Sequence, residues 1–197
     1  MSLKRSYTVL APFYDLVVGP AFRSARRRSL SALPGGGGTV LVNGVGTGLD
    51  LPWLPSGHRY VGLDFTRAML ARSIRRAAGL EFAAVQGDSL ALPFRDASFD
   101  YAVLHLILAV VPDAARALSE TARVVRPRGV ILVFDKFLRP GQRAPLRRLL
   151  SPLAARVATR LDVVFADLLP QVPAVRVLSD EPAAAGGWFR LIRLERL

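Results

Sequence analysis

The 197-residue sequence contains no cysteine and only two histidines. The lack of cysteine excludes a disulfide framework, thiolate metal sites and cysteine nucleophiles. Two histidines are too few to suggest a dedicated zinc or iron site, so we expect no metal centre. The longest apolar run, residues 101–111, ends at Pro112 and is too short to cross a bilayer, which takes about 20 residues. No signal peptide is recognisable near the N-terminus, and we therefore expect a cytoplasmic protein.

Acidic side chains are scarce in two segments, and the positive charge of the chain is concentrated there. The formal net charge is +12. Residues 1–31 hold six lysines and arginines against Asp15 alone, and residues 139–160 hold six arginines and no acid. These two segments carry +11 of the total, so the rest of the chain is nearly neutral. Such clustering favours an anionic partner: a small anionic molecule, an anionic membrane surface or a nucleic acid. The alternative is that these arginines form ordinary solvated faces.

Short β-rich runs alternate with helical stretches through most of the chain. Residues 4–31 read as helical with a break near Gly19 and Pro20, and a glycine-rich turn follows at 35–38. Strands are then predicted at 39–43, 59–63, 81–85 and 130–135, and a further strand within residues 99–108. Helices are predicted at 49–54, 66–78, 113–126 and 161–169. This alternation predicts an α/β fold in which helices cover both faces of a mostly parallel sheet.

The C-terminal part departs from the alternation. Residues 137–160 form a basic insertion with helical character. Two further strands are predicted at 175–179 and 188–193, with only a loop between them. A loop without a helix permits an antiparallel hairpin but not a right-handed parallel crossover. We therefore expect seven strands that end in an antiparallel hairpin, with residues 1–33 as an N-terminal helical cover.

Three successive predicted strands end in residues suited to a nucleoside. The first runs into Asn43-Gly44-Val45-Gly46-Thr47-Gly48, where alternate glycines let the backbone turn sharply and approach a ligand closely. Asp64 ends the second strand, where a carboxylate can accept hydrogen bonds from both hydroxyls of a ribose. Asp88 follows the third strand and can accept a bond from an adenine amino group. Each has an ordinary structural explanation, as a turn or a helix N-terminus, but the combination indicates a nucleoside-binding site.

With these residues the chain resembles the class I S-adenosylmethionine-dependent methyltransferases. The resemblance rests on Gly44, Gly46, Gly48, Asp64, Met69-Leu70 and Asp88, and on residues 92–100 and 123–129, which resemble the family's approaches to strands four and five. Residues 11–15 resemble a subgroup that includes the ubiquinone and menaquinone C-methyltransferases and bacterial phosphatidylethanolamine N-methyltransferases. The resemblance implies a Rossmann-like fold, with residues 34–197 as the methyltransferase domain, and methyl transfer from S-adenosylmethionine.

The resemblance also implies where this cofactor binds. The implied cofactor-binding residues are Asn43, Gly44, Gly46, Gly48, Asp64, Phe65, Asp88 and Ser89. One position differs from the family pattern, which usually has an acid two residues before the first glycine of the loop. Val42 stands there, and Asn43 is a candidate for a substitute polar group.

Two residues are candidates for catalysis near the methyl acceptor. His105 lies on or just past the fourth strand, and histidine is a suitable general base near neutral pH. Tyr14 lies on the N-terminal cover. The alternative for His105 is a buried histidine whose hydrogen bonds are satisfied, and the alternative for Tyr14 is a packing role. Asp135 and Lys136 either line the acceptor pocket or form an internal ion pair.

The leading interpretation is a methyltransferase that acts on a small-molecule or lipid-like acceptor. We expect the protein to lie at the inner face of the membrane as a peripheral protein. In the resembled family, the N-terminal helices and the insertion after strand five cover the mouth of the active site. These are the two cationic segments, so we expect their arginines to form one surface around the mouth, suited to an anionic acceptor or an anionic membrane. One alternative is an RNA methyltransferase, but the sequence has no added RNA-binding domain. The other is a catalytically silent binding protein, which only Val42 supports.

Overall fold

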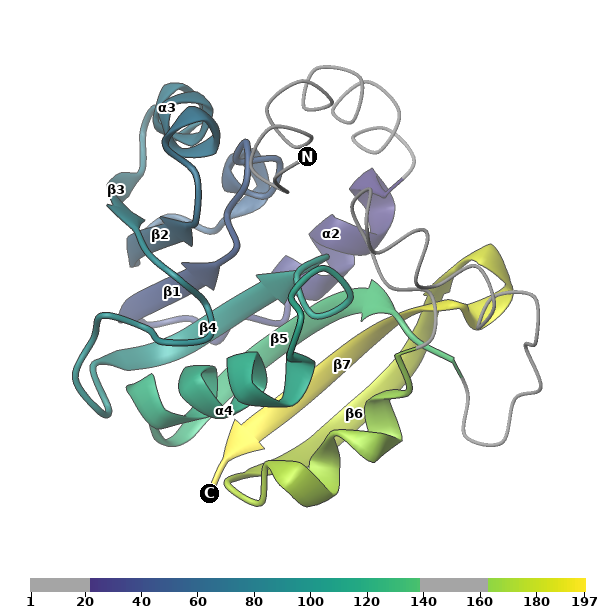
Figure 1. Cartoon of the computed structure of the whole chain (residues 1–197). Coiled ribbons are helices and arrows are strands. Elements are labelled where there is room, and N and C mark those ends of the chain that lie inside the picture. Colours follow the sequence, from purple (N-terminus) through teal and green to yellow (C-terminus); the bar gives the residue numbers. More distant parts are fainter. Residues whose placement is uncertain (1–21, 139–162) are drawn as a thin grey trace, which may run out of the picture.

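The computed structural model describes residues 22–138 and 163–197, in which a single sheet forms the centre of the molecule (Figure 1). Its strands are β1 (Thr39–Asn43), β2 (Arg59–Asp64), β3 (Glu81–Gln86), β4 (Phe99–His105), β5 (Val125–Lys136), β6 (Val175–Ala184) and β7 (Phe189–Arg196). Their order is β3-β2-β1-β4-β5-β7-β6. The first five are parallel, whereas β7 runs antiparallel to both β5 and β6. The predicted seven-stranded, mostly parallel sheet with a C-terminal antiparallel hairpin is confirmed.

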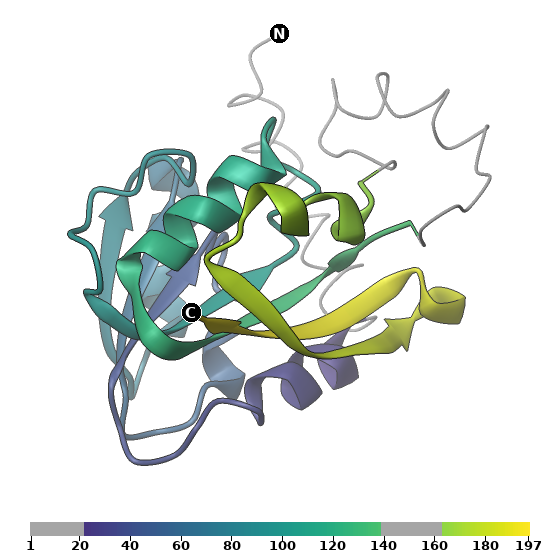
Figure 2. The same ribbon diagram turned by 90° about the horizontal axis from the view of Figure 1, so that it is seen from below.

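Helices cover both faces of the sheet, as predicted. The α-helices are α2 (Arg23–Leu30), α3 (Arg67–Arg76) and α4 (Ala114–Val124). Single-turn 3₁₀ helices are η1 (Leu51–Trp53), η2 (Phe165–Asp167), η3 (Leu169–Gln171) and η4 (Ala185–Gly187). Figure 2 shows α4 on one face and α2 on the other. Helix α4 begins after Asp113, whose carboxylate accepts a hydrogen bond from the backbone N–H of Arg116, as expected for a helix N-cap.

The core lies on both faces of the sheet because successive strand residues point to opposite sides. Leu41 and Leu104 pack in the cluster that includes α4, whereas Val40, Val42 and Val103 pack in the cluster that includes Leu30 of α2. Strands buried on both sides need apolar residues at every position, which explains the continuous apolar runs of the sequence. Helix α2 therefore shares its core with β1.

Some predicted element boundaries are wrong. The α-helix predicted at 161–169 is absent from the described part of that range. Val164 pairs with Leu138 as an isolated β-bridge, and the single-turn helices η2 and η3 occupy the residues after it. The strand predicted within residues 99–108 is Phe99–His105, and the chain leaves it at Leu106, which adopts a left-handed backbone with φ 58°. Strand β6 continues to Ala184 through the loop predicted at 180–187.

Parts of two predicted segments lie outside the described residues. These parts are residues 1–21 of the N-terminal cover, with Tyr14, and residues 139–160 of the basic insertion. Phe137 and Leu138, at the predicted start of the insertion, are buried in the core. Among the residues that the structure describes, no helix is long and apolar enough to cross a membrane.

Candidate active site at the carboxyl edge of the sheet

The candidate site lies where β1 and β4 end. From β1 the strand order runs to β2 and β3 on one side and to β4 and β5 on the other. In open α/β sheets, ligands bind outside the carboxyl ends of the strands at such a reversal of strand order. The loops that follow β1, β2, β3 and β4 all begin at this edge, because these four strands are parallel.

The loop after β1 is shaped by its three glycines. Gly44, Gly46 and Gly48 have φ values of 74°, 56° and 84°, a region that other residues rarely adopt. A Cβ atom on Gly44 would lie 2.7 Å from Ile107, and one on Gly48 would lie 2.9 Å from the Cα of Ser73. At Gly46 the nearest atom would be 3.9 Å away. The first and third glycines are therefore required by close packing, whereas the second leaves open space over the loop.

Asp64, at the end of β2, holds the glycine loop from the side. One carboxylate oxygen, Oδ2, accepts a hydrogen bond of 3.0 Å from the backbone N–H of Gly46. The other, Oδ1, accepts bonds of 2.9 Å and 3.2 Å from the N–H and hydroxyl of Thr66. Burial raises the pKa of Asp64, although these hydrogen bonds act in the opposite direction. The next side chain, Phe65, is 51% exposed.

The loop after β3 is tied to β1 by a buried polar contact. Ser89 donates a hydrogen bond of 2.6 Å to Oδ1 of Asn43, and Nδ2 of Asn43 donates one of 3.0 Å to the hydroxyl of Thr121 on α4. Asn43 is completely buried, so both ends of its amide are used to join β1 to α4 and to this loop. Asp88 remains exposed and accepts a bond from the N–H of Leu90.

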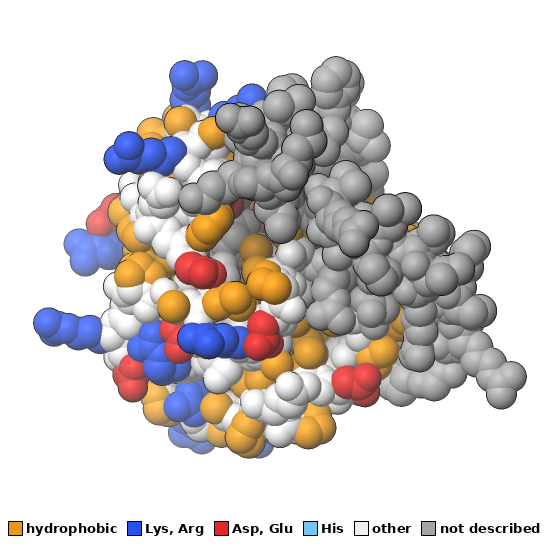
Figure 3. Space-filling model, in the orientation of Figure 1, with side chains coloured by type: hydrophobic (Ala, Val, Ile, Leu, Met, Phe, Trp, Pro, Cys, Tyr) orange, Lys and Arg blue, Asp and Glu red, His pale blue; other side chains and the backbone are white. Residues whose placement is uncertain are grey.

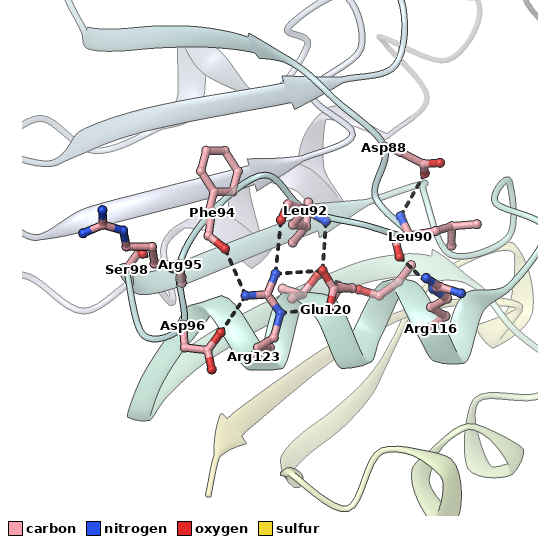
Figure 4. A network of polar contacts seen from close by, with 12 residues as sticks. Asp88, Leu90, Leu92, Phe94, Arg95, Asp96, Ser98, Arg116, Glu120 and Arg123 are labelled. Carbon is pink, nitrogen blue, oxygen red and sulfur yellow. Dashed lines mark hydrogen bonds and ion pairs between the residues drawn. The ribbon is translucent and has the colours of Figure 1, made fainter.

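Arg123 of α4 joins residues 92–100 to residues 123–129, the two stretches that resemble the family's approaches to strands four and five. Figure 4 shows these contacts. Its guanidinium donates to the carbonyls of Leu92 and Phe94 and pairs with Asp96 and Glu120. Hydrogen bonds to Glu120 and Asp96 raise the pKa of Arg123 further above its usual value. The segment between Asp88 and β4 is thereby fixed against α4.

His105 ends β4 in a buried polar network, the alternative that the sequence left open, although the sequence did not suggest its partners. Its Nδ1 lies 2.7 Å from Oδ1 of Asp50, and its Nε2 lies 2.9 Å from the hydroxyl of Ser29 on α2. Nη1 of Arg26, also on α2, donates a hydrogen bond of 2.6 Å to the same oxygen of Asp50. The ring of Phe134 meets the imidazole edge to face at 5.6 Å. His105 is thus buried, with a partner at each ring nitrogen.

The charges of this network fix the state of Asp50. Burial alone raises the pKa of Asp50, but the charges of His105 and Arg26 and the hydrogen bonds from both outweigh burial and hold it well below its usual range. Nε of Arg26 is buried and has no hydrogen-bond partner in the described part of the chain. Asp50 lies in the helix predicted at 49–54, and its position directly after the glycine loop was the one signal in the sequence for a role at the site.

Asp135 and Lys136 occupy the corresponding edge at β5. The buried Asp135 accepts a hydrogen bond of 3.0 Å from the N–H of Ala109 and one of 2.8 Å from that of Lys136. Burial raises the pKa of Asp135 and lowers that of Lys136. Since Ala109 belongs to the loop after β4, Asp135 fixes that loop to β5.

The prediction that all α2 arginines belong to one cationic surface is wrong at Arg26, which is buried against Asp50. Arg23, Arg27 and Arg28 are exposed. The guanidinium carbons of Arg23 and Arg27 lie 5.9 Å and 5.1 Å from the ring centroid of Trp53. On the described part of the face seen in Figure 3, cationic and acidic side chains are interspersed.

A sheet of this order, with a glycine loop after β1 and a carboxylate after β2, defines a nucleoside-binding α/β protein. Comparison with known proteins identifies the family. Residues 41–133 match the methyltransferase domain family. The chain is 32% identical to the phosphatidylethanolamine N-methyltransferase of Cereibacter sphaeroides over 200 residues, which cover 99% of this chain and 98% of the relative. It is 36% identical to the demethylmenaquinone methyltransferase of Roseiflexus castenholzii over 216 residues, which cover 98% and 89%.

A solved structure agrees with this assignment at the level of the fold. The S-adenosylmethionine-dependent methyltransferase of Thermotoga maritima superposes with a TM-score of 0.71 at 19% identity, over 100% of both chains. The protein belongs to the S-adenosylmethionine-dependent methyltransferases, as the sequence resemblance implied, and S-adenosylmethionine is its methyl donor. The described residues fit this cofactor, because Gly46 leaves the loop open and Asp64 presents a carboxylate at its side.

Proposed function

We propose that this enzyme methylates a lipid-like or small-molecule acceptor on the cytoplasmic side of an anionic membrane surface. The observation that supports this proposal is the sequence similarity, over nearly the whole chain, to two methyltransferases whose names specify phosphatidylethanolamine and demethylmenaquinone. Both are amphipathic or apolar molecules. Neither the described fold nor these relatives favour RNA as the acceptor or a silent binding role.

In this proposal the cofactor binds across the ends of β1, β2 and β3. Asp64 accepts the ribose hydroxyls, the loop at Gly44, Gly46 and Gly48 contacts the methionine end, and Phe65 and Asp88 contact the adenine. Asn43 and Ser89 support this pocket through the hydrogen bond that joins them. The bound cofactor supplies a sulfonium methyl group for in-line displacement, and the protein provides position and exclusion of water. Tyr14 stays a predicted acceptor-side residue.

The membrane contact in this proposal is supported by the outer side of α2. Arg23 and Arg27 are four residues apart, and both stack near the partly exposed Trp53. Each arginine near an anionic surface contributes about 1 kcal/mol. Removing both therefore predicts a loss of about 2 kcal/mol, or roughly 30-fold in membrane affinity.

The acceptor is tested by transfer of radiolabelled methyl from S-adenosylmethionine. Vesicles of phosphatidylethanolamine with phosphatidylglycerol, a demethylated naphthoquinol in the same vesicles, and total RNA would be assayed in parallel. Labelled lipid or quinol with unlabelled RNA supports the proposal. Label in RNA alone overturns it.

The membrane contact is tested by co-sedimentation with vesicles of graded phosphatidylglycerol content. Arg23→Gln/Arg27→Gln should weaken binding by roughly 30-fold. The matched control is Arg95→Gln/Arg128→Gln, which removes two exposed arginines, one before β4 and one near the start of β5. Equal loss in both double variants would mean that binding depends only on net charge, and no binding by the original protein would refute the contact.

A further inference from the structure

Asp50, His105 and Ser29 form an ordered carboxylate–imidazole–hydroxyl series. They come from three separate places: the end of the glycine loop, the end of β4 and the inner face of α2. An ionised carboxylate can only accept hydrogen bonds. With Asp50 held ionised, the 2.7 Å contact therefore requires the proton of His105 to be on Nδ1. In the neutral ring, Nε2 is then the basic nitrogen and accepts from the Ser29 hydroxyl at 2.9 Å.

We propose that Asp50 is a positioning residue for methyl transfer, which fixes His105 in this tautomer so that Nε2 receives the proton that the acceptor loses. The proposal rests on the proposed function and deepens it. It implies an acceptor whose nucleophilic atom carries an ionisable proton, as in an amine or a phenol. Ser29 is the partner of Nε2 in the structure, and in this proposal the acceptor replaces it there.

The position of His105 suits this role. The residue after it, Leu106, has a left-handed backbone, and Ile107 packs directly on Gly44 of the glycine loop. In the sequence, His105 therefore precedes by two residues the side chain that joins the loop after β4 to the loop after β1. These loops flank the carboxyl edge at which the cofactor binds in the proposed function.

Groups on every neighbouring element determine the charge that His105 can carry. Asp50 favours the imidazolium, whereas Arg26 of α2, which shares the Asp50 oxygen, opposes it. On β5 the ring faces Phe134, and Lys136 follows two residues later on the same side of the strand. Ser29 is uncharged. One carboxylate oxygen thus serves both Arg26 and His105.

The step is balanced without a further reactant. The acceptor atom forms a bond to the methyl carbon as the carbon–sulfur bond breaks, and the electron pair of that bond stays on sulfur, which becomes a neutral thioether. The proton of the acceptor atom passes to Nε2 of His105. It then leaves to solvent when the product departs and Ser29 returns.

The tautomer can be tested without any acceptor. The chain has only two histidines, so ¹⁵N-correlated NMR of the imidazoles contains two ring systems, and His58→Gln assigns them. We expect His105 as the Nδ1–H tautomer, retained in Ser29→Ala and lost in Asp50→Asn. An Nε2–H tautomer in the original protein overturns the proposal. Since Asp50→Asn leaves Arg26 unpaired, Asp50→Asn/Arg26→Gln provides a second variant if the first does not fold.

Kinetics test the proton transfer. His105→Gln and Asp50→Asn should each lower kcat by about 10²–10⁴-fold and remove the acid limb of the pH–rate profile, while the dissociation constant of S-adenosylmethionine stays nearly constant. His58→Gln, a change at the only other buried histidine, should keep both. An unchanged pH profile in His105→Gln refutes the role. If no acceptor is methylated by the original protein, the proposed function fails, whereas the tautomer result stands independently.

Discussion

Replacement of Asp64 by asparagine tests the cofactor site with the least change in shape. The carboxylate accepts a hydrogen bond from the N–H of Gly46 on Oδ2 and bonds from the N–H and hydroxyl of Thr66 on Oδ1. Asparagine has a single acceptor oxygen, so its amide N–H₂ must face either the N–H of Gly46 or that of Thr66. The variant therefore loses the hydrogen bond from either Gly46 or Thr66, and with it one acceptor oxygen for a ribose hydroxyl.

The expected loss follows from the energy of hydrogen bonds to charged groups. Such bonds contribute about 1.5–3 kcal/mol each. The dissociation constant of S-adenosylmethionine should rise by roughly 10-fold to 150-fold. The melting temperature without cofactor should change less, since the buried carboxylate also loses its desolvation cost when it becomes a neutral amide.

The pH dependence of binding provides a second signature. Burial raises the pKa of Asp64 above its value of about 3.9 in an unfolded chain. A raised folded-state pKa favours the protonated acid, so this contribution to stability is full below the unfolded pKa and is lost as pH rises through the folded pKa. Cofactor affinity follows the opposite course, because only the carboxylate accepts both ribose hydroxyls. It should fall on acidification, starting at a higher pH than for an ordinary aspartate.

Isothermal titration calorimetry between about pH 4.5 and about pH 7.5 measures both effects. Asp64→Asn should bind weakly with little dependence on pH. The control is Asp96→Asn, at a carboxylate whose side chain is 78% exposed and which pairs with Arg123 away from β1. Unchanged affinity in a folded Asp64→Asn variant, or equal weakening in Asp96→Asn, would refute the assignment of Asp64 to the ribose.

Three further predictions concern the buried contacts of the site. Gly44→Ala should lower the melting temperature, because its Cβ would lie 2.7 Å from Ile107. Gly46→Ala should fold, at a cost of about 1–2 kcal/mol for its left-handed backbone, and lose cofactor binding in calorimetry. Asn43→Leu should cost about 1–3 kcal/mol in denaturant unfolding by leaving the Ser89 hydroxyl without its acceptor, and Ser89→Ala in the same chain should recover part of this; no recovery would contradict the coupling. Arg26→Met should cost about 3–5 kcal/mol in denaturant unfolding, because it leaves the buried Asp50 carboxylate without its arginine partner; no measurable cost would argue against this ion pair.

The sheet could be predicted from the sequence because its strands are buried on both faces. Continuous apolar runs separated by helical stretches with glycine and proline turns leave few other folds. The boundaries depended on tertiary contacts instead. The apolar run of β4 continues past His105, yet the chain leaves the strand at Leu106, whose φ is 58°. The bonds from the N–H of Leu106 to the carbonyl of Phe134 and from the N–H of Ala109 to Asp135 hold the following turn against β5. No local pattern encodes those bonds.

The candidate cofactor site was similarly predictable in outline. Glycine spacing and strand-ending carboxylates are local signals, and the structure brings Gly46 and Asp64 into direct contact. The partner of Asn43 was not predictable, since Ser89 and Thr121 are distant in sequence and meet only when α4 packs on the sheet. Asn43 was a candidate for a polar group that substitutes for the acid missing at Val42, and the side chains of these adjacent strand residues point to opposite faces. Its amide therefore faces α4, whereas Val42 lies in the apolar core on the α2 side.

Burial of Arg26 shows how a charge count can mislead about a surface. The buried residues of α2 are Ala25, Arg26, Ser29 and Leu30, which follow the spacing expected of the inner face of a helix. Arg26 lies in that stripe, whereas Arg23 and Arg27 lie outside it. An arginine on the inner face requires a buried acid as its partner, because an unpaired buried charge is too costly. Asp50 meets that requirement. The same carboxylate also binds His105, so the helix that carries the exposed arginines is joined through one buried oxygen to the proposed base of methyl transfer.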